Sequence, residues 1–291
     1  MTFVVLLLAL LAERFLLDQY DWRQARWLER YFVTEMSHQY RTWISGRYWG
    51  ALIVLAPPLL LVGLLQGAFE GIAGDSLSFI FAVVVLLYCF GPDDLETQTA
   101  DFINAEERGD HDNAKVFAQT ICQCEPADTP AERMRQVRES VIVQYNQRIF
   151  AVILWFLILG PLGAVLYRFS RQLGSFISKD SEPAPYNQGI KQLLHILDWL
   201  PTRLMVIAFA LVGSFDNTMH RWRKWDMEQR DNYDEEAQGL LINTSEGALM
   251  IDENRTGDEE AETAQLDAAL SLAWRTLVVW LVLIGFIDFA I

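Results

Sequence analysis

Cysteine is scarce in this chain, with 3 residues among 291. Cys89 lies in an apolar run and is expected to be a small buried side chain. Cys122 and Cys124 form a C-x-C pair, which is shorter than the redox C-x-x-C motif, and no second pair lies near enough to complete a zinc site. The sequence therefore predicts no disulfide framework and no metal site.

Positive charge is in deficit as well, because 23 lysine and arginine residues face 38 acidic residues and the formal net charge is −15. Nucleic-acid-binding proteins concentrate basic side chains against phosphate, so nucleic acid is not expected as a partner. Attachment to anionic lipid through an amphipathic helix would need a basic face, so the acidic balance argues against it as well. The excess acid falls between apolar runs, where it keeps solvated segments soluble.

The sequence motifs of common enzyme classes are missing. The chain contains no G-x-x-x-x-G-K-[ST], G-x-G-x-x-G, H-E-x-x-H or G-x-S-x-G. Asp93 and Asp94 offer oxygen ligands, but an N-cap after an apolar run explains them better than a metal ion does. The sequence therefore assigns no catalytic residue and no cofactor, and it leans toward a protein that is not an enzyme.

Long hydrophobic runs are present instead, and 52% of the residues are hydrophobic. A membrane-spanning helix needs about 20 apolar residues, because each adds about 1.5 Å across a core of about 30 Å. The first run has no basic start and no cleavage site, so it is expected to be a retained helix and not a signal peptide. The runs that meet or approach the required length cover residues 2–17, 49–66, 77–90, 149–167 and 268–291.

These runs predict an all-α, polytopic helical membrane protein with about four to six membrane-embedded helices and helical soluble segments. Its expected parts are N-terminal membrane helices with an interfacial helix (1–92), an acidic helical soluble segment (93–147), membrane helices (148–215), an acidic, partly mobile soluble segment (216–267) and a C-terminal membrane helix (268–291).

Local signals refine this outline. Pro57 and Pro58 should kink or break the second run, with neighbouring helices satisfying the freed carbonyls. Residues 101–120 are expected to form one helix, and Thr129-Pro130 has the features of a helix start. Residues 204–215 are short for a span, so they pair with the preceding helix, are re-entrant, or join residues 193–200 across a proline.

One candidate site lies in HILDWLPTRL, which begins at His195 and enters an apolar stretch. In the structural reading, Trp199 anchors at the membrane interface and Asp198 caps a helix or pairs with Arg203. In the functional reading, Arg203 binds an anionic group, because its planar fork can hold two oxygens, and Asp198 and His195 orient it. The sequence alone leaves both readings open.

A second candidate is the Glu13-Arg14 pair at the end of the first apolar run. Charges at the edge of a membrane are costly and usually face a bundle interior or water. The pair is either part of a ligand site or a simple anchor for the helix end.

Residues 193–213, LLHILDWLPTRLMVIAFALVG, resemble the AmpE family of inner-membrane proteins associated with β-lactamase induction in Gram-negative bacteria. The resemblance extends to Glu13-Arg14-Phe15, to Gly160-Pro161-Leu162-Gly163 followed by Tyr167, and to the final apolar run. It implies a multi-pass protein of the bacterial inner (cytoplasmic) membrane with a role in signalling.

The AmpE family is itself similar to adenosylcobinamide-phosphate synthase, whose D/N-W-x-P-x-R-L motif is present here at residues 198–204. Other elements of that enzyme family have changed: Gln144 and Gln147 stand where Asn and Asp are expected, and Arg171 replaces an Asn. An ATP-dependent amide ligase needs carboxylates or amides to hold metal and phosphate. These departures imply a relative that kept the fold without the synthase chemistry.

The leading interpretation is a membrane sensor or signalling protein that modulates β-lactamase induction or the response to cell-wall disturbance, and so the response to antibiotic. Its expected partners are the lipid bilayer, an anionic small molecule (a nucleotide or a muropeptide) bound near Arg203, and a membrane or cytoplasmic protein. The alternatives are an amide-bond-forming synthase of the cobinamide type and a structural or partner-binding membrane protein.

Overall fold

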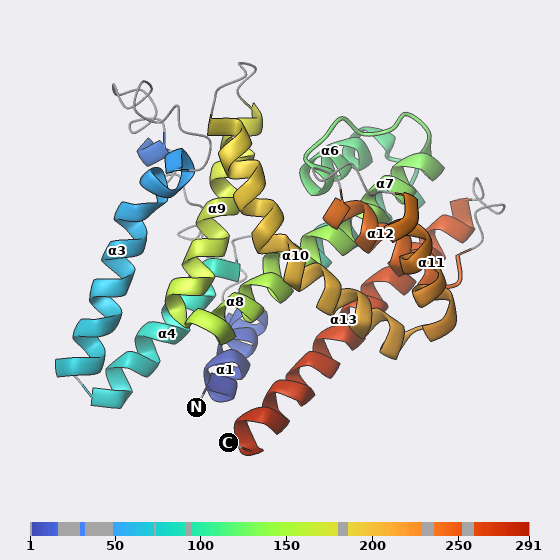
Figure 1. Ribbon diagram of the computed structural model, residues 1–291. Coiled ribbons are helices and arrows are strands. Elements are labelled where there is room, and N and C mark those ends of the chain that lie inside the picture. The colour runs from blue at the N-terminus through green and yellow to red at the C-terminus, as the bar shows by residue number, and fades with distance from the viewer. Residues whose placement is uncertain are drawn as a thin grey trace. The chain divides into compact units, whose positions relative to one another are not determined.

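The predicted all-α membrane class is confirmed in a computed structural model of the chain (Figure 1). The structure describes residues 2–16, 30–32, 49–72, 74–90, 95–179, 186–228, 236–251 and 259–290, and these contain no β-strand. Within these ranges, 5 helices are long and apolar enough to cross a membrane, and a shorter apolar helix covers Phe3–Glu13. The number agrees with the expected four to six. Asp93 and Asp94 lie outside the described residues.

The helices fall into two units, each described here by itself. Unit 1 comprises residues 1–92 and 151–201, and unit 2 comprises residues 93–150 and 202–291. The helices are α1 (Thr2–Leu16), α3 (Trp49–Ile72), α4 (Gly74–Phe90), α5 (Leu95–Glu107), α6 (His111–Cys122), α7 (Pro130–Tyr145), a π-helical turn (Asn146–Phe150), α8 (Ala151–Leu159), α9 (Pro161–Lys179), α10 (Tyr186–Val212), α11 (Phe215–Glu228), α12 (Glu236–Ala248) and α13 (Glu259–Ala290).

In unit 1, α9 packs against α3, α4 and α8, and α1 packs against α4. Helix α3 is not broken by Pro57 and Pro58. Pro58 has no N–H to donate to the carbonyl of Val54, four residues earlier, and the hydroxyl of Tyr31 donates to that oxygen instead, at 2.9 Å. A neighbouring segment thus satisfies a carbonyl that the proline frees, as expected.

The expected span over residues 149–167 is wrong, because the helix ends at Leu159 and a new helix begins at Pro161. Gly160 adopts a left-handed conformation, with φ +67°, and this lets the chain turn sharply. Gly163 then lies so close to α8 that a Cβ there would overlap the carbonyl of Trp155. The membrane-length helix in this region is Pro130–Leu159, formed by α7, the π turn and α8.

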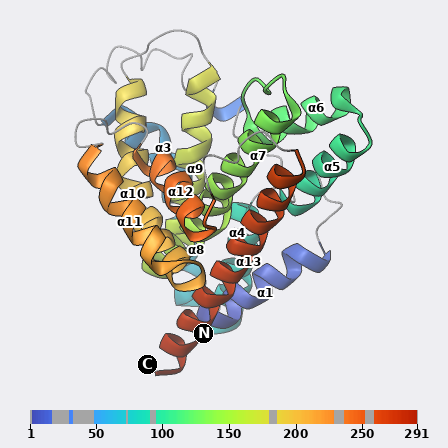
Figure 2. The same ribbon diagram turned by 90° about the vertical axis from the view of Figure 1, so that its right-hand side faces the viewer.

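In unit 2, α7 and α13 run parallel and side by side (Figure 2). Met134 contacts Thr263 near the start of both helices, and the rings of Phe150 and Trp280 pack edge to face further along, with centroids 5.7 Å apart. Both helices are polar at first and apolar later. The polar first halves of the two helices therefore lie at the same end of the pair.

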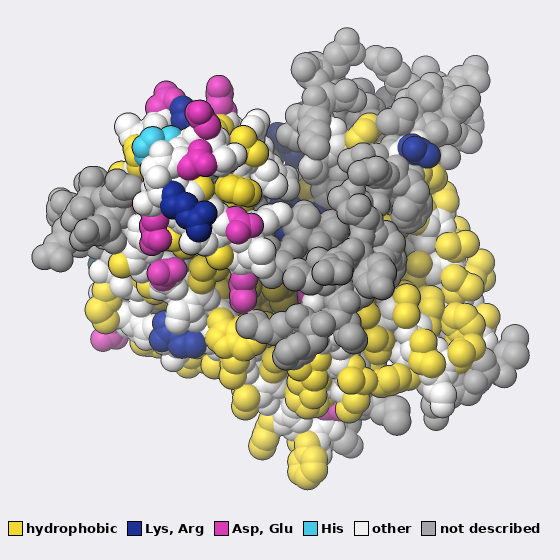
Figure 3. Space-filling model, turned by 180° about the vertical axis from the view of Figure 1, so that it is seen from behind, with side chains coloured by type: hydrophobic (Ala, Val, Ile, Leu, Met, Phe, Trp, Pro, Cys, Tyr) yellow, Lys and Arg dark blue, Asp and Glu magenta, His cyan; other side chains and the backbone are white. Residues whose placement is uncertain are grey.

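The more polar part of unit 2 consists of α5, α6, α11, α12 and the first halves of α7 and α13. Helix α7 begins as expected, with Thr129 as N-cap and Pro130 in its first turn. The single helix expected over 101–120 is interrupted, because Gly109 adopts φ +71° and Asp110 caps a new helix. Charged side chains gather over this part, whereas the end of α13 exposes hydrophobic residues such as Phe286 and Phe289 (Figure 3).

Candidate functional site

The carboxylate of Asp198 on α10 is buried and is held by two donors from α9. The hydroxyl of Tyr167 donates to Oδ1 at 2.7 Å, and Nη1 of Arg171 donates to Oδ2 at 3.2 Å. Tyr167 is fully buried, and Arg171 follows it by four residues, so both face the same way along α9. These three residues form the Asp198 cluster, which lies wholly within unit 1.

The backbone around the cluster depends on a proline in α10. Helix α10 runs without a break through Pro201, so residues 193–200 and 204–212 join across it. Pro201 cannot donate to the carbonyl of Leu197, and the indole N–H of Trp155 on α8 donates to that oxygen instead, at 3.0 Å. Gly174 on α9 lies close to Leu194, where a Cβ would not fit. Together these contacts position α10 beside α8 and α9.

The other residues predicted for the site lie at different places. His195 is one turn before Asp198, on the same side of α10. Arg203 follows Asp198 by five residues, so on a continuous helix the two point about 140° apart. Glu13 is half-buried near the end of α1, and the side chain of Arg14 lies outside the described residues.

Sequence reasoning missed the pairing of Asp198 with Arg171, because the two are 27 residues apart and meet only through packing of α9 on α10. Tyr167 was recognised as part of a family stretch, but not as a partner of Asp198. A usable signal was the spacing of four between Tyr167 and Arg171 on a strongly amphipathic helix.

The chemistry of the cluster is that of a neutralised carboxylate. An Arg–carboxylate pair with a further tyrosine hydrogen bond satisfies a buried charge that would be costly alone. Among the described residues, no group of three or more His, Cys, Asp or Glu side chains is placed to hold a metal ion. Nearby, Gln172 Oε1 on α9 and Gln192 Oε1 on α10 are buried without a hydrogen-bond partner among the described residues.

The fold and this cluster define a multi-pass helical membrane protein with a charged pair held between helices. The chain belongs to the AmpE family: the family described as regulatory signalling modulator protein AmpE matches residues 1–289. It is therefore a multi-pass bacterial membrane protein, with a lipid bilayer as its environment.

Individual relatives divide between two names. The chain is 25% identical to "Protein AmpE" of Shigella flexneri over 230 residues, 76% of this chain and 78% of that protein. It is 24% identical to "Cobalamin biosynthesis protein CobD" of Stutzerimonas stutzeri over 259 residues, 83% of this chain and 84% of that protein. A protein of the same name from Chromobacterium violaceum is 30% identical over 118 residues, 40% of this chain and 36% of that protein. No solved structure matches the chain.

Proposed function

We propose that this chain is a signalling modulator of the bacterial inner membrane that acts on β-lactamase induction or the response to cell-wall disturbance. The family match over residues 1–289 supports a modulator role. The observation that carries the proposal is the Arg171–Asp198 pair. Arg171 places its guanidinium at the position where the similar synthases are expected to have the amide of an asparagine.

The Arg171 guanidinium changes what Asp198 can do. A carboxylate beside a small neutral amide can accept a metal ion or a polar substrate group. A carboxylate paired with Arg171 and hydrogen-bonded to Tyr167 has no net charge left to offer. The retained motif then serves to hold α10 in place, which suits a protein that responds to a ligand better than one that performs ligation.

The ligand of the modulator is proposed to be an anionic small molecule, a nucleotide or a muropeptide, bound at Arg203. Arg203 is half-buried on α10, and its planar fork matches carboxylate and phosphate oxygens. Asp198 and His195 would act indirectly, by fixing the rotation of the helix that presents Arg203. Glu13 and Arg14 remain a second proposed contact for the ligand.

The test is deletion of the gene in a strain that carries an inducible β-lactamase. We expect altered induction by a β-lactam, restored by the wild-type chain and not by Arg203→Gln at equal membrane abundance. Unchanged induction after deletion would count against the regulatory role. Restoration by Arg203→Gln would remove Arg203 from the ligand site while leaving the role intact.

The second candidate function is an amide-bond-forming synthase. The relatives named as cobalamin biosynthesis proteins and the motif at residues 198–204 favour it. Expression of the chain in a cobalamin auxotroph that lacks this synthase distinguishes the two. We expect no rescue, and growth without added cobalamin would overturn the modulator reading.

A third reading is a structural or partner-binding membrane protein, in which α10 only holds helices together. In that case Arg203→Ala would lower the melting temperature of the purified protein and would leave β-lactam induction unchanged at matched abundance.

A further inference from the structure

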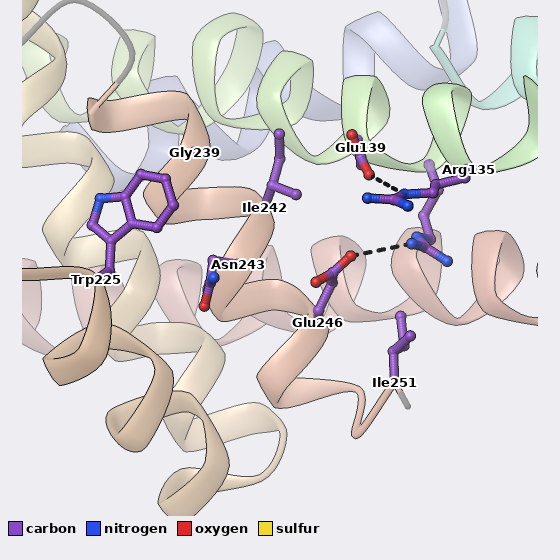
Figure 4. A pocket seen from close by; sticks show the side chains of 9 residues that line it. Arg135, Glu139, Trp225, Gly239, Ile242, Asn243, Glu246 and Ile251 are labelled. Atoms are coloured by element: carbon purple, nitrogen blue, oxygen red, sulfur yellow. Dashed lines mark hydrogen bonds and ion pairs between the residues drawn. The ribbon is translucent and has the colours of Figure 1, made fainter. Parts of the chain in front are cut away.

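A cavity of about 440 Å³ lies in unit 2, between α7, α11 and α12 (Figure 4). This volume falls within the range of small-molecule sites. The helices α11 and α12 are not among those apolar enough to cross a membrane, and the residues of α7 that line the cavity, Arg135, Arg138 and Glu139, are all charged. A water-soluble ligand can therefore reach the cavity, which is separate from the Asp198 cluster.

One side of the cavity is aromatic and apolar. The ring of Trp225 lies directly against Gly239, where a Cβ would overlap ring carbons. Ile242 follows on the same helix and faces the cavity (Figure 4). The absence of a side chain at Gly239 therefore lets the indole ring approach α12 closely, and an indole face attracts both apolar groups and cations.

The other side carries two cations and two anions. Nε of Arg135 donates to Oε1 of Glu139 at 2.8 Å, and the two terminal nitrogens of Arg135 make no hydrogen bond to a described residue. Arg138 is already committed, because it donates to Glu246 at 3.2 Å and to Glu262 at 2.9 Å. Arg135 is thus the guanidinium that can bind a further anionic group.

The cavity wall also contains a hydrogen-bond acceptor that has no donor in the part of the chain that the structure describes. Oδ1 of Asn243 is buried and has no hydrogen-bond partner among the described residues. Asn243 lies on the cavity wall between Trp225 and Glu246 (Figure 4). A buried oxygen of this kind is costly unless a donor reaches it, and an ammonium group placed there would also meet the indole face. The nearby Glu246 carboxylate is already paired with Arg138 and Arg221.

We propose that this cavity binds a zwitterionic amino acid or short peptide. The carboxylate would pair with the terminal nitrogens of Arg135, the ammonium would donate to Asn243 Oδ1, and an apolar side chain would contact Ile242 and Trp225. A purely anionic ligand would meet Glu139 and Glu246, and a purely cationic one would meet Arg135 and Arg138, whereas a zwitterion complements both signs. The inference stands on the cavity alone and does not require the regulatory role.

The experiment is a thermal-shift titration of the full-length protein in lipid nanodiscs with three matched probes. These are glycyl-leucine, N-acetyl-glycyl-leucine, which lacks the ammonium, and glycyl-leucinamide, which lacks the carboxylate. We expect glycyl-leucine to raise the melting temperature saturably and each capped form to bind at least about tenfold more weakly, since each loses a charged hydrogen bond. Free leucine in the same titration shows whether a single amino acid suffices.

Variants locate the binding. Arg135→Gln should weaken glycyl-leucine about tenfold and leave glycyl-leucinamide unchanged, because only the former has a carboxylate to lose. Asn243→Leu should weaken both peptides that keep the ammonium. Arg108→Gln, at an exposed arginine of the same unit outside the cavity, is the control and should change nothing. Equal binding of the three probes, no shift up to roughly 10 mM, or wild-type binding by Arg135→Gln would each overturn the proposal.

Discussion

Arg171 and Asp198 form a partly buried ion pair, and removing only one of the two charges should destabilise the protein. In Arg171→Leu, the carboxylate keeps only the Tyr167 hydroxyl, so we expect a loss of about 3 kcal/mol in the free energy of unfolding. The double variant Arg171→Leu/Asp198→Leu should recover most of this loss, because no unpaired charge remains. Melting of both variants in nanodiscs measures the difference, and a single variant as stable as wild type would show that the pair contributes nothing.

Cys122 on α6 provides a second prediction at this scale. Burial raises the pKa of its thiol from 9.0 to about 11, outweighing a hydrogen bond with Ser140. At pH 8 the folded protein should hold about a hundredfold less Cys122 thiolate than the unfolded chain, and only the thiolate reacts with iodoacetamide. Alkylation of Cys122, followed by mass spectrometry, should therefore rise about tenfold per pH unit up to about pH 11. A rate that levels off near pH 9 would contradict the raised pKa.

At the scale of the helix, Trp155 and Pro201 should be energetically coupled. Trp155→Phe removes the side-chain donor to the Leu197 carbonyl, and we expect it to cost about 1–3 kcal/mol. Pro201→Ala restores a backbone N–H at the position that bonds this carbonyl within the helix. The double variant should therefore be more stable than the sum of the two single changes predicts, as a double-mutant cycle on melting data would show. Strict additivity would refute the coupling.

The turn between α8 and α9 gives another prediction. Gly163→Ala would place a Cβ against the Trp155 carbonyl and the Leu159 side chain, so we expect destabilisation by about 1–3 kcal/mol. Gly67→Ala on α3 is the matched control, because nothing lies within 4 Å of its Cβ position and alanine favours a helix. Equal melting temperatures for the two variants would mean that the close approach of α8 and α9 is not needed.

For the molecule as a whole, the parallel packing of α7 and α13 predicts that two distant segments share one side of the membrane. Two variants test this: one keeps Cys124 as its only cysteine, and the other has no native cysteine and carries Asp226→Cys. When intact cells are treated with an impermeant maleimide, both variants should be labelled or both should be protected. Both sites are exposed, so permeabilised cells should show labelling of each. Labelling of one and protection of the other in intact cells would contradict the arrangement.

The sequence predicted the class of fold well, because membrane spans are set by the length of apolar runs. It failed where one residue redirects the chain. Gly160 and Gly109 both have positive φ, and nothing in a glycine alone indicates whether a helix continues or turns there. For the candidate site, the sequence singled out Asp198 but did not predict its partners Tyr167 and Arg171, since their identity depends on which helices pack together.

The cavity in unit 2 was not anticipated for the same reason. Arg135 and Glu139 belong to one acidic segment and Trp225 and Asn243 to another, about 90 residues later. Both segments were predicted to be soluble, the first helical and the second partly mobile, but their mutual packing was not predicted. The packing of α12 against α7 and α11 creates a lining that neither segment has alone.

Pro58 in α3 and Pro201 in α10 each free a carbonyl that accepts a hydrogen bond from an aromatic side chain, and this has a consequence for the assembly of the bundle. Between helices in lipid the hydrophobic effect does not discriminate one neighbour from another, so correct pairing must depend on shape and on hydrogen bonds. The freed carbonyls of Val54 and Leu197 accept a bond only when Tyr31 or Trp155 arrives in the right register. A helix inserted beside the wrong neighbour, or displaced by one turn, would leave a bare carbonyl in hydrocarbon at a cost of several kcal/mol. These prolines therefore confer fidelity on the folding of the bundle, and their loss should appear first as misassembled protein in the membrane.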